Sequence, residues 1–289
     1  MITPKIIVLP VDFSTLSASA AAHARIMAKQ YGATIVALHV MRPFHLAAEG
    51  VDVSSAVVLD WYARQKPLLQ SQLEEFVNIY LKNCKVKTIF REGDPAAEIV
   101  RAANEEKADL IIIATRGYGP FRRFLLGSVA AKVLNDSLIP VLTGAHIEVP
   151  AGEAEHIKSI VVAVELDDRA GLLIAAGNSI AKSFDAELHV VHASPDDGAG
   201  AAQYMDPAWR VEVARMLKER LEESVKDAAA TATVHVIPGE PAEVVRQVAE
   251  DVHADLVVLG RHMDKSLLGR LRTHSYAIVR EAPCPVLSL

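Results

Sequence analysis

The chain has 289 residues, which is long enough for two domains of ordinary size. Apolar residues make up 51% and charged residues 23%, a balance that excludes a disordered chain. The formal net charge of −6 excludes a global positive field that would attract nucleic acid or an anionic membrane, so any basic site has to be local.

Short apolar runs alternate with longer helical patterns along the first half of the chain. Continuous apolar runs such as residues 111–113 are typical of strands buried on both faces of a parallel sheet. The order β-α-β-α-β-α-β-α-β predicts a doubly wound α/β domain with helices on both faces. The predicted strands cover residues 6–11, 34–40, 86–90, 110–113 and a short run at 141, and the predicted helices cover 14–31, 54–84, 95–107 and 128–135.

The second half of the sequence repeats the first. Gly-Asp-Pro at residues 93–95 is echoed by Gly-Glu-Pro at 239–241, and Ala-Asp-Leu at 108–110 is echoed at 254–256. Both echoes lie 146 positions downstream, so they are not a chance pairing of apolar runs. We predict two copies of one domain, over residues 1–146 and 155–289, joined by a linker rich in turn signals at 143–158.

Several function classes are excluded by what the sequence lacks. It has no Walker phosphate loop, no Gly-x-Gly-x2-Gly after the first strand and no Gly-x-Ser-x-Gly nucleophile elbow. No uncharged run of 18 residues occurs and the start does not read as a secretory signal, so we expect a cytoplasmic protein. Cys84 and Cys284 are too few for a disulfide scaffold. His39, His189 and His192 are expected to be packed histidines, and no metal site is predicted.

The carboxyl ends of three predicted strands in the first half carry candidate ligand-binding residues. Ligands of open parallel sheets bind at these ends, where the strand order reverses. Asp12 follows the first strand, and a loop after the fourth strand leads through Gly117 to Gly127 and a helix at Ser128. A helix N-terminus favours an anion and glycine allows close backbone approach, so the loop predicts a phosphate site. Two alternatives stay open: Asp12 as a helix-capping residue and the glycines as turn residues. Positive charge in the loop comes from Arg116, Arg122 and Arg123.

Together these features resemble the universal stress protein family. The resemblance rests on the strand order, the acid after the first strand, Gly-Asp-Pro before the third helix, and Gly-x9-Gly-Ser leading to Pro-Val-Leu. It covers essentially the whole chain as a tandem of two domains. It implies two repeated doubly wound domains, each a five-stranded parallel sheet flanked by helices, of the adenine nucleotide alpha hydrolase-like, Rossmann-like kind.

The resemblance also implies a ligand and its contacts. Many members of the family bind ATP through Gly-x2-Gly-x9-Gly-(Ser/Thr), which here falls on Ala114, Gly117, Gly127 and Ser128, with alanine in place of the first glycine. Such an alanine is tolerated where the backbone φ is negative. ATP is the expected cofactor, with AMP or ADP as alternatives and Mg²⁺ as the ion that would accompany ATP. The implied contacts are Pro10, Val11, Asp12, Val40, Ile113 and Ala114 for adenine and ribose, and Arg116, Gly117, Gly127, Ser128 and Val129 for ribose and phosphates.

The second copy departs from this pattern, so we expect it to be degenerate and not to bind ATP in the family's way. A long side chain in place of the phosphate-contacting glycine blocks backbone approach, and a positive φ there would add a steric cost. The departures are Glu165 for Asp12, Ala193 for Val40, Met263 for Gly117 and Arg272 for Gly127. The basic loop of this copy is expected to be solvated, with a site for another anion as the alternative. Its basic residues are Arg261, Lys265, Arg270 and Arg272.

The leading function that follows is an ATP-binding stress-response regulatory protein and not an enzyme. ATP in the first domain would bias a conformation that an unknown protein partner reads. The last strands, at 141–143 and 286–288, are expected to pair as an intrachain pseudo-dimer, and two chains to form a homodimer. The alternatives are a slow ATPase or autophosphorylating enzyme, disfavoured because no general base or Mg²⁺ carboxylate pair is evident, and a nucleotide-free interaction scaffold.

Overall fold

The computed structural model describes residues 3–42, 56–115, 126–144, 156–194, 207–261 and 273–289. Both repeats have the predicted order of strands and helices. The first repeat contains β1 (Ile6–Pro10), α1 (Thr15–Tyr31), β2 (Thr34–Met41), α2 (Ala56–Tyr80), β3 (Lys85–Glu92), α3 (Pro95–Glu105), β4 (Leu110–Ile113), α4 (Ser128–Asp136) and β5 (Val141–Thr143). The second contains β6 (Ser159–Ala163), α5 (Ala170–Phe184), β7 (Glu187–Ser194), α6 (Pro207–Asp227), β8 (Thr233–Pro238), α7 (Pro241–Asp251), β9 (Leu256–Leu259), α8 (Thr273–Glu281) and β10 (Val286–Ser288).

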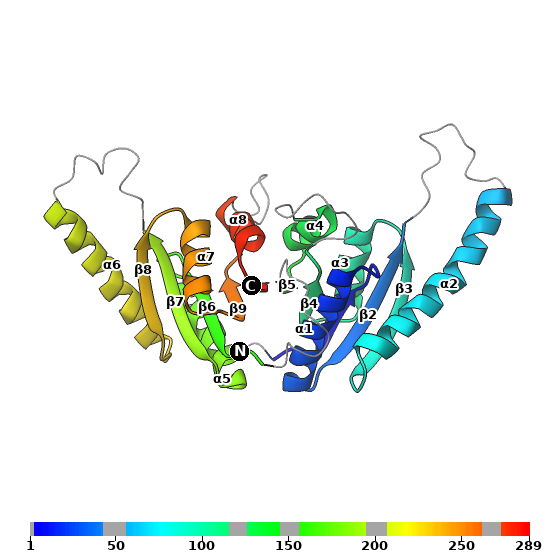
Figure 1. The fold of residues 1–289 in the computed structure, drawn as a ribbon, viewed down its shortest axis with the longest axis horizontal. Coiled ribbons are helices and arrows are strands. Elements are labelled where there is room, and N and C mark those ends of the chain that lie inside the picture. The colour runs from blue at the N-terminus through cyan, green and yellow to red at the C-terminus, as the bar shows by residue number, and fades with distance from the viewer. Residues whose placement is uncertain (1–2, 43–55, 116–125, 145–155, 195–206, 262–272) are drawn as a thin grey trace.

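The described strands form one sheet that runs through both repeats (Figure 1). Its ten strands follow the order β3-β2-β1-β4-β5-β10-β9-β6-β7-β8. Neighbours within each repeat are parallel, whereas β5 and β10 are antiparallel, with Leu142 opposite Leu287. The predicted pairing of the two final strands is thereby confirmed.

The helices cover both faces of the sheet, and each face has its own core. Ile7 and Leu9 of β1 pack with α1 and α2 on one face, while Val8 packs with α3 and α4 on the other. The second repeat does the same, with α5 and α6 on the first face and α7 and α8 on the second. Both cores continue across β5 and β10. The doubly wound α/β prediction is confirmed in both repeats.

Local sequence explains where the elements begin and end. Ser14 caps α1 by accepting from the Ser17 N–H, and Gly32 ends the helix with a φ of 65°. The third helix was predicted to reach residue 107 but ends at Glu105, because Lys107 has a left-handed φ of 53°. Strand β3 is longer than the predicted 86–90, since all of it pairs with β2. Helix α2 ends at Tyr80, short of the predicted residue 84.

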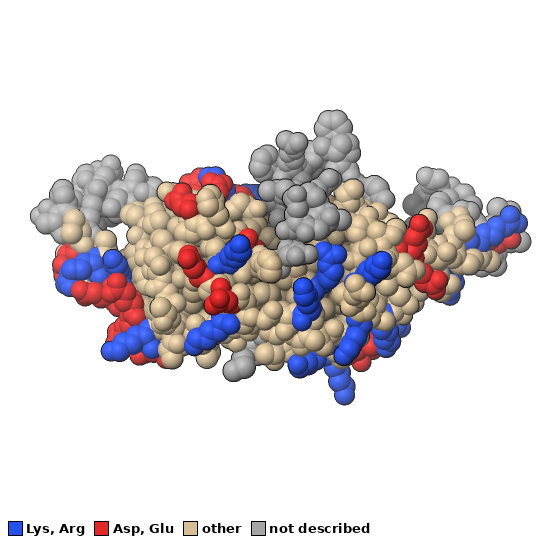
Figure 2. All heavy atoms as spheres, turned by 60° about the horizontal axis from the view of Figure 1, so that its bottom comes forward, with Lys and Arg blue, Asp and Glu red and all other residues tan. Residues whose placement is uncertain are grey.

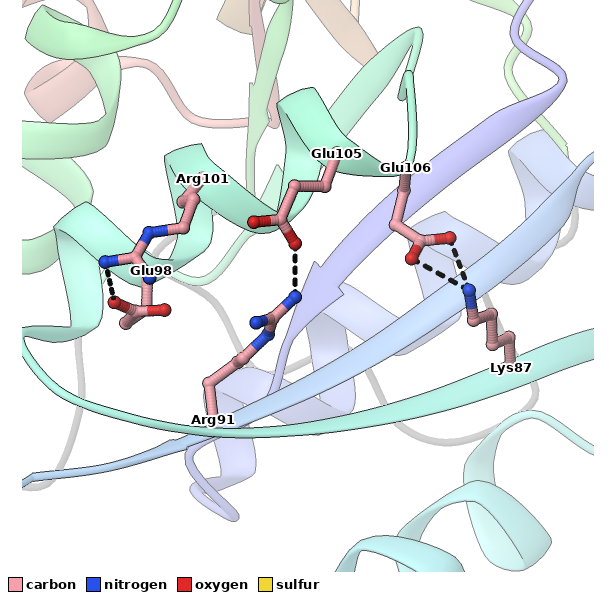
Figure 3. Close-up of polar contacts among 6 residues, drawn as sticks. All are labelled: Lys87, Arg91, Glu98, Arg101, Glu105 and Glu106. Atoms are coloured by element: carbon pink, nitrogen blue, oxygen red, sulfur yellow. Dashed lines mark hydrogen bonds and ion pairs between the residues drawn. The ribbon is translucent and has the colours of Figure 1, made fainter.

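The outer edge of the first repeat is protected by charge. Edge strand β3 carries Lys87 and Arg91, which pair with Glu106 (2.6 Å) and Glu105 at the end of α3, as Figure 3 shows. These pairs are partly exposed to solvent, so they contribute little stability. A charged edge does, however, disfavour pairing with a strand of another protein.

Helix α6 at the other end of the molecule carries charges of both signs. Arg215 pairs with Glu212 (2.5 Å) and Glu219 at helical spacing, and Figure 2 shows acidic and basic side chains intermingled there. On the face seen in Figure 2, this helix therefore presents charges of both signs. Within the described ranges, no helix is both long enough and apolar enough to span a membrane.

Candidate functional site

A cavity of about 580 Å³ lies at the carboxyl ends of β1, β2 and β4. We call it the first cavity. Strand β1 pairs with β2 on one side and β4 on the other, so the cavity lies where the strand order reverses. Its volume is in the range of pockets that hold small molecules.

The first cavity brings together the sequence-predicted site residues that the structure describes. They come from the ends of three strands and from the start of α4. All nine line the cavity: Pro10, Val11, Asp12, Val40, Ile113, Ala114, Gly127, Ser128 and Val129. Arg116 and Gly117, together with Arg122 and Arg123, lie outside the described residues.

Asp12 is engaged at the start of α1. Its Oδ1 accepts hydrogen bonds from the Ser14 N–H (3.0 Å), the Ser14 hydroxyl (2.6 Å) and the Ser17 hydroxyl. The capping role considered for Asp12 is therefore present, although Ser14 is the N-cap residue itself. None of these bonds uses Oδ2, and Asp12 also lines the first cavity.

Helix α4 reaches the cavity with an uncapped N-terminus. Gly127 is its N-cap and makes no side-chain hydrogen bond, and no acid lies in the first turn. By contrast, Ser14 caps α1 and Asp94 caps α3. The first N–H groups of a helix have no partner inside it and form the positive end of its dipole. The N–H groups of Ser128 and Val129 are thus placed to bind an anion at the cavity wall.

The backbone of Gly127 differs from one expectation. Its φ is −62°, a value that any residue adopts, so a larger residue at this position would not strain the backbone. Its N–H donates to the carbonyl of Thr115 (2.7 Å), which joins the two ends of the loop between them. The glycine can matter only because it has no side chain. Ala114 also lacks a positive φ, as its substitution for glycine requires.

His39 is a packed histidine, as predicted. Its Nδ1 donates to the Val11 carbonyl (2.8 Å), and its ring stacks on Phe13 with centroids 4.5 Å apart. Burial lowers the pKa of His39, although the Val11 carbonyl and Asp12 oppose the shift. In the described part of the chain, no three His, Cys, Asp or Glu side chains are grouped so that they could hold a metal ion.

Comparison with known protein families shows to which family the two repeats belong. The sequence model of the universal stress protein family matches it twice, over residues 3–143 and 156–289. The chain belongs to the universal stress protein family. It is a tandem of two such domains.

Individual relatives match one repeat of this universal stress protein or its whole fold. Universal stress protein MJ0531 of Methanocaldococcus jannaschii is 37% identical over 142 residues, which are 48% of this chain and 80% of that protein. Universal stress protein YxiE of Bacillus subtilis is 31% identical over 143 residues, 46% of this chain and 93% of its own. A crystal structure of a universal stress protein from Archaeoglobus fulgidus covers 99% of this chain and 96% of its own with a TM-score of 0.69. At 24% identity it shows the shared fold.

Sequence reasoning missed Arg42, a cavity residue of this universal stress protein. Arg42 directly follows the carboxyl end of β2, so the strand-end rule could have found it. It also borders an adjoining hollow with Asp94, Ser128 and Lys132. Lys132 pairs with Asp94 (3.1 Å), and the Ala97 N–H, Lys132 and Arg42 lower the pKa of that carboxyl. Two cations therefore lie beside the uncapped start of α4.

The second repeat has a cavity of about 440 Å³ at the corresponding strand ends, which we call the second cavity. Glu165 and Ala193 line it as expected, but the expectation of a solvated Arg261 is wrong. Arg261 is 6% exposed and donates to the carbonyls of Leu134 (3.2 Å), Ser137 (2.9 Å) and Ile139 (2.7 Å). These carbonyls lie in the last turn of α4 and directly after it, where the negative end of the helix dipole attracts a cation. Lys265, Arg270 and Arg272 lie outside the described residues.

Proposed function

We propose that the first cavity binds ATP and that the bound nucleotide acts as a conformational signal. The observation that carries the proposal is the uncapped N-terminus of α4, which faces a cavity where nine predicted contact residues meet. An uncapped helix start beside Arg42 and Lys132 favours a polyanion. The apolar walls of the first cavity favour a flat ring.

The residues divide the ligand into three parts. The adenine would pack against Val11, Val40 and Ile113, which line the cavity with apolar surface. Oδ2 of Asp12 would accept a ribose hydroxyl, because Oδ1 is engaged by Ser14 and Ser17. The phosphates would accept hydrogen bonds from the first turn of α4. AMP and ADP would use the same base and ribose contacts.

Binding without turnover is favoured over the alternative of a slow ATPase. Among the described residues that line the first cavity, Asp12 is the one carboxylate, and its Oδ1 already accepts three hydrogen bonds. A phosphoryl-transfer site uses carboxylates to hold Mg²⁺ and to orient the nucleophile. Mg²⁺ would therefore be carried mainly by the phosphates of ATP.

The signal would travel through α4. Its first turn would hold the phosphates, and its last carbonyls accept from Arg261 of the second repeat. ATP would favour the conformation in which both contacts form, and a regulatory partner would distinguish that conformation. The second repeat would act as a built-in partner of the first, and a homodimer of whole chains would add further contacts.

Native mass spectrometry of the full chain tests the proposal. We expect one adenine nucleotide per chain, carried from purification or taken up from added ATP. The same samples incubated with labelled ATP should release no more than one equivalent of product. An absence of nucleotide even with excess ATP would instead favour the nucleotide-free scaffold, and repeated turnover would favour the enzyme.

A further inference from the structure

The second cavity reaches the seam between the repeats, whereas the residues that line the first cavity all come from the first repeat. Besides the strand ends, its wall includes Leu172, Leu173 and Ala176 of α5, as well as Pro140 of the first repeat. The first cavity instead extends past Met41 and Arg42 to Leu69 of α2. The two cavities therefore differ in shape as well as in lining.

Helix α5 has apolar side chains at three positions where α1 has polar ones, of which Ser17 lines the first cavity. Ser17 of α1, which bonds to Asp12, is replaced by Ala170 at the matching position. Ser19 is replaced by Leu172 and His23 by Ala176, and both replacements line the second cavity. Leu172 is 74% exposed although it is a large apolar side chain. An exposed leucine at a cavity rim is available to cover an apolar ligand.

The cations at the second cavity are held by groups of the protein itself. Arg261 donates to three carbonyls of the first repeat. Arg169 pairs with Asp167 (2.9 Å), and His274 contacts Glu240 (2.8 Å). Arg261 and Arg169 already contact acceptor groups of the protein, which weakens their attraction for an added phosphate.

The neighbourhood of α8 has also lost basic residues relative to α4. Arg42 is matched by proline at 195 and Lys132 by Ala277, whereas acidic Glu165 and Asp167 lie in the wall. Glu165 and Asp167 balance the charge of Arg169 and Arg261 in the lining, so the cavity has no excess of positive charge to attract a phosphate, and its apolar walls suit an uncharged molecule.

We propose that the second cavity is a separate binding site for an uncharged, mostly apolar small molecule. Its volume of about 440 Å³ suits a compound of two or three rings. This inference goes beyond the nucleotide proposal and does not depend on it, because the two cavities have no lining residue in common.

A pair of fluorescent probes with the same rings tests the inference on the full chain. N-phenyl-naphthylamine is neutral, and anilinonaphthalenesulfonate adds one negative charge to it. We expect saturable binding of the neutral probe at one site per chain, at least roughly tenfold tighter than the sulfonated probe because a buried charge would lack a partner. Equal affinity for the two probes would overturn the assignment, as would the absence of saturation.

Two variants locate the probe. Leu172→Glu places a charge on the cavity wall at an exposed position, and Ala176→Phe fills the space from α5. Each should weaken the neutral probe roughly tenfold. Val211→Glu is the matched control, because Val211 is 72% exposed and lies in α6 of the same repeat without lining the cavity. An equal loss in the control, or unchanged binding in both cavity variants, would contradict the proposal.

Discussion

At the scale of single residues, the first cavity separates main-chain roles from side-chain roles. The Gly127 N–H is used by the Thr115 carbonyl, so this glycine serves to close the loop and to leave space. The proposed anion contacts lie one step further on, in the N–H groups of Ser128 and Val129. A side chain at position 127 should therefore act by occupying phosphate space while leaving the fold intact.

Gly127→Arg tests that separation, because it copies the arginine that the second repeat has at the matching position. We expect ATP affinity measured by calorimetry to fall by roughly a hundredfold or more, since the side chain would displace phosphates from the helix start. The thermal unfolding midpoint should change little, because the φ of −62° suits any residue.

Gly171→Arg is the control for this experiment. A Cβ at Gly171 meets no heavy atom within 4 Å, and the residue lies in α5 outside both cavities. It adds the same charge and bulk, so it should keep the wild-type affinity. If Gly127→Arg also kept that affinity, the phosphates would not lie at the start of α4.

His23 makes the stability of the first repeat depend on pH. Burial lowers its pKa to about 4, and its buried Nε2 has no hydrogen-bond partner within the described ranges. An unfolded histidine titrates near 6.5, so between pH 6.5 and 4 the unfolded chain binds more protons and stability falls as the pH falls. From pH 7 to 5 this histidine should cost about 2 kcal/mol of unfolding free energy.

The variant His23→Leu should remove that share of the pH dependence. Urea unfolding at pH 7 and pH 5, with both proteins in the same buffers, measures it. Burial also lowers the pKa values of His39, His189 and His235, so the variant keeps part of the loss on acidification. The difference between the two proteins isolates His23. Identical losses in both would show that His23 takes up its proton in the folded state at an ordinary pH.

At the scale of elements, each repeat packs its first helix against its first strand, but the residues at the matching positions differ. In the first repeat Ala24 of α1 and Leu9 of β1 are both fully buried. The matching pair in the second repeat is Gly177 of α5 and Val162 of β6. A Cβ on Gly177 would overlap Cγ2 of Val162, so the glycine allows the helix to approach a β-branched residue.

Gly177→Ala should therefore destabilise the protein by about 1 to 3 kcal/mol, although alanine is the better helix former. Adding Val162→Leu recreates the Leu–Ala pair of the first repeat and should restore most of the loss, because leucine has no branch at Cβ. Urea unfolding of the single and double variants measures both effects. A single variant as stable as the wild type would show that β6 and α5 can move apart freely.

The elements were largely predictable from sequence, because the repeat at a fixed offset and the continuous apolar strands carry strong signals. Strand β3 was predicted too short, since its charged ends at Lys85 and Glu92 belong to an edge strand whose length is set by pairing with β2. In the site, the strand-end rule and the family resemblance gave nine residues that line one cavity. The orientation of Arg261 could not be predicted, because it depends on how one repeat lies against the other.

At the scale of the whole molecule, α4 connects the first cavity to the second repeat. Its positive end faces the proposed phosphate site, and its negative end receives the buried guanidinium of Arg261. Arg261 follows Gly260 at the end of β9, and both residues also line the second cavity. Together with the β5–β10 pairing, this contact fixes the repeats relative to each other.

Arg261→Ala should loosen that connection. It removes the guanidinium donor from the carbonyls of Leu134 and Ser137 and leaves the Ile139 carbonyl with the Ser137 hydroxyl, at a cost of about 3 kcal/mol for the group. Amide hydrogen exchange in the last turn of α4 should accelerate at least roughly tenfold, while exchange in β1 and β6 should change less.

Arg261→Lys should recover only part of the protection, because the single ammonium group of lysine cannot reach all the carbonyls that the planar guanidinium group contacts. Arg246→Ala is the control, since Arg246 is exposed and pairs with Glu250 one turn along α7. If α4 exchanged at the wild-type rate in Arg261→Ala, the bonds from Arg261 would not be what protects the last turn of α4.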